Sequence, residues 1–213
     1  MTLIARLVPV LGLLAAAGLL PGCGGSGDPE VERINRLGQQ KNVAALEREI
    51  DAKDPEVGCQ AVRALGQLGP LARPQVERAM TNPRAEVRRE AMAVYPRVYS
   101  GPTAPLLATA ARTDPDPTVR AVAVTALGRM RALDEIEALL AAAQEADPGV
   151  RGRASDAIAV IMGGRFDFSG TEADRSQTAA EVRRAWHDQS EFLRQYYQAA
   201  PAKPPTPPRP TAP

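Results

Sequence analysis

Small apolar residues recur at helical spacing through the middle of the chain, and each run begins in the same way. An Asp-Pro pair comes first, and Val, Ala and Leu then follow on one helical face; one copy has Asp116-Pro117, Val119, Ala123 and Leu127. Asp accepts hydrogen bonds from the free amides of the first turn, and Pro at the first helical position loses no bond there. The pattern therefore predicts an amphipathic helix with a defined start in each copy.

The pattern occurs four times at a nearly constant distance along the chain. Successive valines of the motif are 30, 32 and 31 residues apart, and they are Val57, Val87, Val119 and Val150. A second amphipathic helix is predicted over residues 43–50, 74–80, 104–111 and 134–146, and Arg36-Leu37-Gly38 resembles the end of a further first helix. One helical pair cannot bury its apolar faces alone, so we expect the pairs to stack. The predicted fold is all-α, a right-handed α-solenoid of roughly four to five helical pairs over residues 30–165.

The motifs themselves resemble a known repeat. Asp116-Pro-Thr-Val-Arg120 and Ala126-Leu-Gly128 are similar to the signature of the short HEAT-like repeats named after the phycocyanobilin lyases. The resemblance implies the stacked fold described above and covers about two thirds of the chain that follows residue 22. It does not imply one function, because solenoids host many unrelated roles.

Charged residues recur with the repeat, and we expect them to form a structural ladder rather than a carboxylate active site. Gly58 stands where other copies have Arg, and Asn82-Pro83 comes two residues early. The ladder should therefore be weakest between the first two clear copies. Its predicted members are Asp54, Asp116 and Asp147 together with Arg88, Arg120 and Arg151.

An uncharged segment, residues 7–20, precedes the repeats and follows the single charge of Arg6. As a helix it would reach roughly 21 Å, short of a hydrocarbon core of about 30 Å, and this length is typical of a secretory signal. The next residues, Leu20-Pro21-Gly22-Cys23, resemble the lipobox of bacterial lipoproteins. The resemblance implies a signal peptide over residues 1–22 and acylation, by palmitate or a similar chain, of Cys23. An ordinary signal peptide followed by an incidental cysteine is the alternative.

A lipidated Cys23 would place the protein in the cell envelope, on the extracytoplasmic side of a membrane. Residues 23–29 would then be a short linker to the repeats. Gly24 is not the Asp that retains lipoproteins in the inner membrane of the best-studied sorting system, which favours the outer membrane over the plasma membrane if the cell has both. Cleavage removes Arg6 and leaves 25 basic and 25 acidic residues, so attachment would not depend on anionic lipid.

Six of the eight aromatic residues lie between positions 166 and 197. Thr178-Ala-Ala-Glu181 fits a capping box and predicts the start of a terminal helix that carries Trp186. Within an aromatic-rich segment over residues 166–200, this helix either closes the open end of the solenoid or offers an aromatic binding patch. The seven prolines of residues 201–213 indicate a disordered tail, which serves as a spacer or as a ligand.

Composition narrows the possible chemistry. The chain has 26 Lys and Arg against 25 Asp and Glu, so it lacks the basic excess of a nucleic-acid-binding protein. His187 is the only histidine, which removes most metal and triad chemistry, and Cys59 fits a half-buried apolar position better than a nucleophile. We therefore expect no enzyme, no cofactor, no metal and no nucleic acid.

The favoured hypothesis is a membrane-anchored extracytoplasmic scaffold that offers a groove of mixed charge to an unknown protein partner. The alternatives are a cofactor-handling enzyme or chaperone similar to the phycobilin lyases, against which the secretory signal argues, and an envelope tether that uses the Pro-rich tail. The candidate interaction surface lies on the second helices and the terminal helix, and comprises Glu47, Arg48, Glu77, Arg78, Glu135, Glu137 and Trp186.

Overall fold

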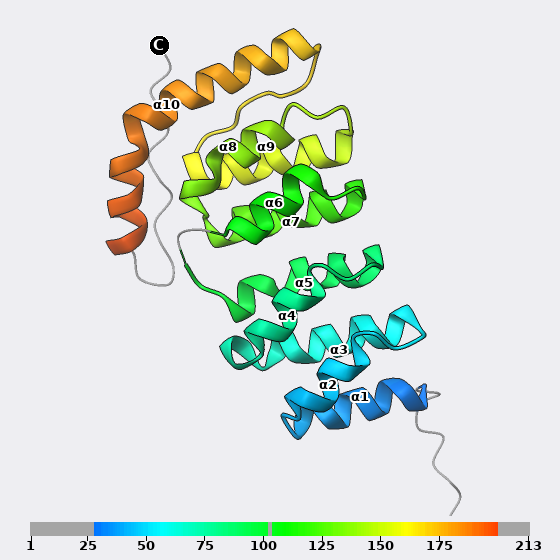
Figure 1. Cartoon of the computed structure of the whole chain (residues 1–213). Helices are drawn as coiled ribbons and strands as arrows, with labels where there is room; N and C mark the ends of the chain where they lie inside the picture. Colours follow the sequence, from blue (N-terminus) through cyan, green and yellow to red (C-terminus); the bar gives the residue numbers. More distant parts are fainter. Residues whose placement is uncertain (1–27, 102–103, 200–213) are drawn as a thin grey trace, which may run out of the picture.

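The computed structural model describes residues 28–101 and 104–199, and every regular element in that part of the chain is helical. Pairs of helices stack into an elongated array, which confirms the predicted all-α solenoid (Figure 1). Each of these pairs has a long helix followed by a short one. The long helices are α1 (Pro29–Gln39), α3 (Pro55–Gln67), α5 (Ala85–Val98), α7 (Pro117–Met130) and α9 (Pro148–Met162), and the short helices are α2 (Val43–Glu49), α4 (Arg73–Ala79), α6 (Pro105–Thr113) and α8 (Ile136–Ala142).

The long helices start where the sequence predicts. The side chains of Asp54, Asp116 and Asp147 each accept a hydrogen bond from a first-turn amide, at 2.9, 2.7 and 2.9 Å. Asp28 does the same for α1, so the first helix has a complete Asp-Pro start that the sequence interpretation missed. The start of α5 differs, because Arg84 is its N-cap residue and makes no side-chain capping bond.

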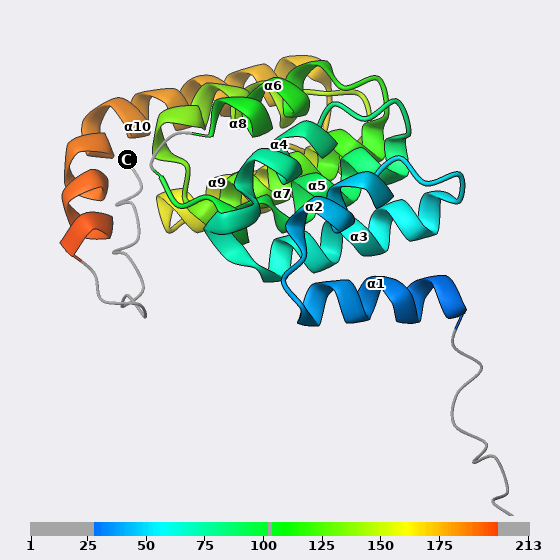
Figure 2. The same ribbon diagram turned by 60° about the horizontal axis from the view of Figure 1, so that its bottom comes forward.

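Small residues allow the long helices to pack closely in one layer, with the short helices in a second layer beside them (Figures 1 and 2). The alanine that comes four residues after the valine of each motif is completely buried. A Cβ atom on Gly128 would lie 2.7 Å from the Cβ of Ala157, so α7 and α9 can approach this closely only because position 128 is glycine. Turns of 3-10 helix, η1 (Gly69–Ala72) and η2 (Leu133–Glu135), lead into α4 and α8.

The terminal helix α10 (Glu172–Ala199) begins earlier than predicted. The capping box is formed by Thr171 and Asp174: the amide of Thr171 donates to Asp174 at 2.8 Å, and the amide of Asp174 donates to the Thr171 hydroxyl at 3.2 Å. Thr178 lies inside the helix, and its hydroxyl donates to the carbonyl of Asp167. The prediction of a start at Thr178 was wrong because a Thr-x-x-Glu pattern also occurs within helices.

Helix α10 crosses the end of the stack and bends along its length (Figures 1 and 2). It buries Ala179, Val182 and Leu193, and the hydroxyl of Tyr197 lies 3.1 Å from the last carbonyls of α9. The predicted signal peptide, Cys23 and the Pro-rich tail over residues 201–213 lie outside the described residues. Of the helices within the described part, none is long and apolar enough to cross a membrane.

Candidate interaction groove

Two arginines of the predicted ladder connect consecutive repeats along the edge formed by the loops. Arg88 donates to both carboxylate oxygens of Asp114, at 2.8 and 2.9 Å, and also to the carbonyls of Asn82 and Pro83 in the loop before its own helix. The hydrogen bonds to Asp114 raise the pKa of the Arg88 guanidinium.

Arg120 repeats this arrangement one unit later, with Glu145 as its carboxylate partner and the carbonyls of Asp114 and Pro115 as its loop acceptors. Arg151 donates to the carbonyls of Glu145 and Ala146. The aspartates of the predicted ladder cap helices instead. The carboxylates that pair with Arg88 and Arg120 are Asp114 and Glu145, which lie two residues before the capping residues Asp116 and Asp147. Sequence reasoning missed Asp114 and Glu145 because each lies 25 or 26 residues from the arginine it contacts.

At the junction between the first two clear copies, the loop carbonyls also bond to an arginine, but this arginine comes from the next repeat. A Cβ atom on Gly58 would lie 2.7 Å from the carbonyl oxygen of Ile50, so no larger residue fits there without a shift. Arg84, from the next repeat, donates instead to the carbonyls of Ala52 and Lys53, at 2.6 and 3.4 Å. These carbonyls correspond to those that Arg88 and its counterparts contact in the later copies.

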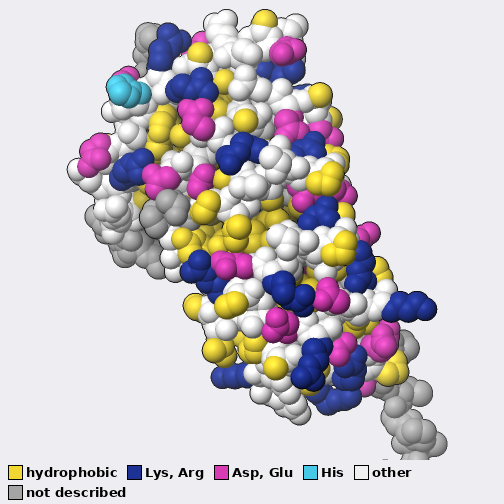
Figure 3. Space-filling model, in the orientation of Figure 1, with side chains coloured by type: hydrophobic (Ala, Val, Ile, Leu, Met, Phe, Trp, Pro, Cys, Tyr) yellow, Lys and Arg dark blue, Asp and Glu magenta, His cyan; other side chains and the backbone are white. Residues whose placement is uncertain are grey.

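Most of the second-helix candidates form contacts within the protein, on a face where charges of both signs are interspersed (Figure 3). Glu47 lies 3.5 Å from Arg78, whose guanidinium also donates to Asp51. Glu77 accepts from Arg73 at 2.7 Å and from the Tyr95 hydroxyl at 3.1 Å. Burial, together with this bond to Glu77, raises the pKa of Tyr95 to about 12.

Of the remaining candidates, Glu135, Glu137 and Trp186 lie toward the end of the array that α10 covers, and Arg48 lies on α2. Glu135 accepts a hydrogen bond from the amide of Ala104, at the start of α6. Glu137 accepts two from Arg183 of α10, at 2.8 and 2.7 Å, and these bonds lower the pKa of its carboxyl. Half-buried Trp186 lies under the Arg194 guanidinium, 5.8 Å from the ring centre, and Arg48 is exposed and makes no such contact with the described residues.

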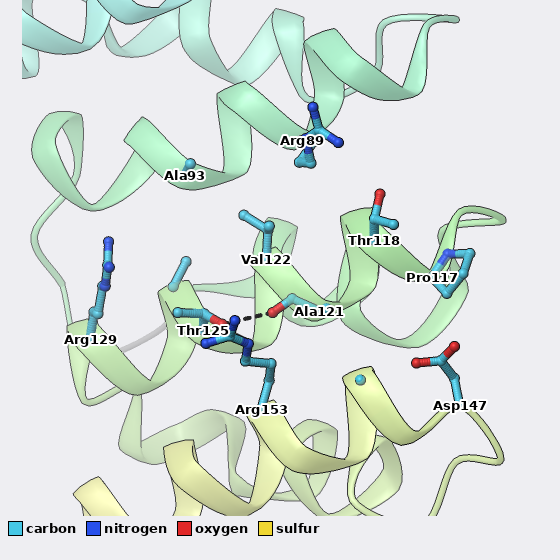
Figure 4. A pocket seen from close by; sticks show the side chains of 12 residues that line it. Arg89, Ala93, Pro117, Thr118, Ala121, Val122, Thr125, Arg129, Asp147 and Arg153 are labelled. Atoms are coloured by element: carbon cyan, nitrogen blue, oxygen red, sulfur yellow. Dashed lines mark hydrogen bonds between the residues drawn. The ribbon is translucent and has the colours of Figure 1, made fainter.

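The opposite face, formed by the long helices, carries a hollow that the sequence interpretation missed. Its volume is about 510 Å³ and it lies across α5, α7 and α9 (Figure 4). A second hollow of about 170 Å³ shares Thr125, Arg129 and Arg153 with the first and continues to the exposed side chain of Val160. We refer to the two together as the long-helix groove.

The long-helix groove combines an apolar floor with unpaired positive charge. Its floor consists mainly of small or apolar side chains: Ala93, Pro117, Ala121, Val122 and Ala126. Arg89, Arg129 and Arg153 line it, are exposed, and form no hydrogen bond or ion pair with the described residues. Such a surface attracts carboxylates, because none of these guanidinium groups is already paired with a carboxylate of the described residues.

The acidic residues of the groove form no ion pair with these arginines. Asp147 accepts the amide hydrogen of Val150 as the cap of α9, and Asp156 lies at the smaller hollow. The hydroxyl of Thr125 donates to the Ala121 carbonyl within α7, as the dashed line in Figure 4 shows. The free donors of the groove are therefore those of its three arginines.

The described residues give little support to a metal site or a reactive thiol. Among residues 28–101 and 104–199 there is no cluster of three His, Cys, Asp or Glu side chains that could hold a metal ion. Cys59 is fully buried rather than half-buried as predicted, and this burial raises the pKa of its thiol. A buried thiol with a raised pKa is a poor nucleophile.

Comparison with known proteins agrees with the repeat architecture. A family model of HEAT repeats matches residues 103–195, which extend from α6 into the last turns of α10. No curated protein matches the chain. The family match supports HEAT-like repeats in the part of the array that contains most of the long-helix groove.

Proposed function

We propose that this protein is a non-enzymatic interaction scaffold that binds an acidic, partly apolar segment of a partner protein in the long-helix groove. The observation that carries the proposal is the set of unpaired arginines, Arg89, Arg129 and Arg153, around an apolar floor. The HEAT-repeat match supports it, because solenoids of this type use extended surfaces to bind other proteins.

The groove suits a peptide segment better than the second-helix face does. Its floor carries short side chains, which let the backbone of a bound segment approach α7 closely. Its arginines can form two-point hydrogen bonds with carboxylates and need not first break an internal ion pair. On the second helices, most candidate charges already have partners within the chain, so an external ligand would have to compete with them.

We further propose that an acyl chain on Cys23 anchors the scaffold on the extracytoplasmic side of the envelope. The uncharged segment over residues 7–20 and the Leu20–Cys23 motif support this proposal. Only four residues separate Cys23 from Asp28, where the described part begins, so the array would be held close to the membrane.

The anchor is tested by growing cells with a labelled fatty acid and following the label on the protein. We expect wild type and Cys59→Ser to carry the label, and Cys23→Ser to lose it and leave the membrane fraction. Cys59→Ser is the matched control, since it removes the other cysteine of the chain. Membrane retention and full labelling of Cys23→Ser would overturn the proposal.

The groove is tested by placing a photo-crosslinking amino acid at Val122, inside it, or at Leu71, an exposed position outside it. We expect a defined crosslinked product from position 122 only. Charge reversal of the three groove arginines to Glu should abolish that product. Reversal of three exposed arginines elsewhere, Arg48, Arg97 and Arg112, should leave it unchanged.

Either of two results would count against the groove. One is a product of equal yield from position 71. The other is loss of the product in the control variant but not in the groove variant, which would show that the partner depends on arginines outside the groove.

A further inference from the structure

A separate pocket lies where α7 ends, between the last turn of α5 and the last turns of α10. Its volume is about 500 Å³, and its walls include Tyr99, Arg129, Arg131, Arg194 and Tyr197. We call it the α7-end pocket. Arg129 also lines the long-helix groove, so the two hollows meet at that residue.

Arg131 has an unusual backbone conformation at this pocket. It ends α7 in the left-handed region, at φ 49° and ψ 51°, where glycine is strongly preferred. Helix α9 ends in the same region with Gly163, as expected. A non-glycine residue held in such a conformation is a reason to look for a role of its side chain.

The side chain of Arg131 also has unused hydrogen-bonding capacity. Its guanidinium lies over the ring of Tyr197, 4.7 Å from the ring centre, and its Nε atom is buried without a hydrogen-bond partner. A buried donor without an acceptor is costly, and native proteins rarely leave one in this state. Stacking on Tyr197 fixes the plane of the guanidinium and so orients its donors in advance.

Two of the other polar side chains of the pocket are already engaged. Arg194 pairs with Asp134, and the hydroxyl of Tyr197 lies within hydrogen-bonding distance of the Val160 and Ile161 carbonyls. The charged donors of the pocket that have no ionic partner are those of Arg131 and Arg129. A planar group with two acceptor oxygens matches an arginine fork best.

We propose that the α7-end pocket is a second binding site and that it holds a carboxylate of a partner peptide. The carboxylate comes from an Asp or Glu side chain or from the end of a chain. Met130 and Leu133 line the same pocket and would contact an apolar neighbour of the carboxylate. The proposal deepens the proposed function by naming this partner chemistry, but the pocket can be tested without the natural partner.

The test is a titration of the full chain with three short peptides, followed through the Nε–H signal of Arg131 in a nitrogen–proton correlation spectrum. The probes are acetyl-Ala-Leu-Glu-Ala-amide, acetyl-Ala-Leu-Ala-Ala with a free carboxylate, and acetyl-Ala-Leu-Gln-Ala-amide. We expect at least one charged peptide to shift the signal saturably and to bind at least about tenfold more tightly than the Gln peptide. The charged peptide that binds better identifies the source of the carboxylate.

Arg131→Gly separates binding from folding. Because glycine suits a φ of 49°, this variant should melt at the same temperature as wild type or higher, yet bind the charged peptides at least about tenfold more weakly. Lys41→Gly is the matched control, since Lys41 has a φ of 52° and lies outside the pocket. It should gain similar stability and keep full binding.

Equal binding by wild type and Arg131→Gly would overturn the proposal, as would the absence of a shift with both charged peptides. A double variant, Arg89→Glu with Arg153→Glu, alters the groove and leaves the pocket residues intact. Suppose that this variant still forms the crosslinked product and that the peptides do not bind to it. The pocket proposal then fails, and so does the proposal that the groove arginines attract the partner. If it loses the partner but binds the peptides, the pocket proposal is supported and stands apart from the groove.

Discussion

Arg88 and Arg89 are consecutive residues of α5 but belong to two regions with different demands. Arg88 lies on the loop edge, where its side chain is 12% exposed and bonds to Asp114 and to two carbonyls. Arg89 lies in the long-helix groove, exposed and without such a bond. Consecutive residues of a helix point about 100° apart. Two neighbouring arginines can therefore serve different purposes, one in structure and the other in recognition.

The contrast extends along the array. On the loop edge, Arg120 repeats the contacts of Arg88 with the next repeat, and Arg84 supplies part of them at the first junction. In the groove, Arg129 and Arg153 resemble Arg89 in having no internal partner. We therefore expect loop-edge variants to change stability and groove variants to change binding.

The largest effect is expected for Arg88→Ala. The change leaves the carboxylate of Asp114, which is 6% exposed, without its charged partner, and should lower the free energy of unfolding by about 3 kcal/mol. Arg89→Ala should change it by less than about 0.5 kcal/mol. Urea denaturation followed by circular dichroism measures both, and equal losses from the two variants would contradict the division between the regions.

A smaller effect is expected at Gly58, which occupies the position of Arg88 in the first clear copy. In Gly58→Ala the new Cβ would meet the Ile50 carbonyl oxygen at 2.7 Å and Val87 at 3.3 Å, so overpacking should cost about 1–3 kcal/mol. Gly152→Ala is the control, because a Cβ there meets nothing within 4 Å. That change should be stabilising, since alanine favours a helix over glycine by up to about 1 kcal/mol.

The two regions differ in how far the sequence predicts them. The Asp-Pro starts and the apolar face depend on residues a few positions apart, so the repeat and the solenoid follow from local pattern alone. The partners of Arg88 and Arg120 depend on how neighbouring repeats stack, and the sequence interpretation chose the capping aspartates instead of Asp114 and Glu145. The groove was missed for a further reason: an unpaired arginine is recognised only once every neighbour has been placed.

A smaller loss still is expected for Arg84→Ala. The carbonyls of Ala52 and Lys53 would lose a charged donor, but both lie near solvent and can bind water instead, so the cost should be about 1 kcal/mol. Arg97→Ala, at an exposed position of the same helix, serves as the control and should be neutral. If the two variants have the same stability in urea, the contacts by which Arg84 replaces an arginine at position 58 contribute nothing to the free energy of unfolding.

The smallest effect concerns Arg183, which is as exposed as a groove arginine but is paired with Glu137. This pairing lowers the pKa of the Glu137 carboxyl, so the stabilisation it gives is present at neutral pH and is lost as the pH falls through that lowered value. Because both side chains are more than half exposed, solvent should limit the contribution to about 0.5 kcal/mol. Glu137→Gln should therefore be less stable than wild type by this amount at about pH 7 and equally stable at about pH 3.

The fluorescence of Trp186 is a suitable signal for this comparison, since the only tryptophan of the chain lies on α10 with Arg183. Asp188→Asn, an exposed change on the same helix, controls for the loss of a carboxylate as such. A difference between wild type and Glu137→Gln that persists unchanged at about pH 3 would show that packing rather than charge holds α10 at this point. A difference that disappears would show that pairing gives even an exposed arginine a structural role, which the groove arginines lack.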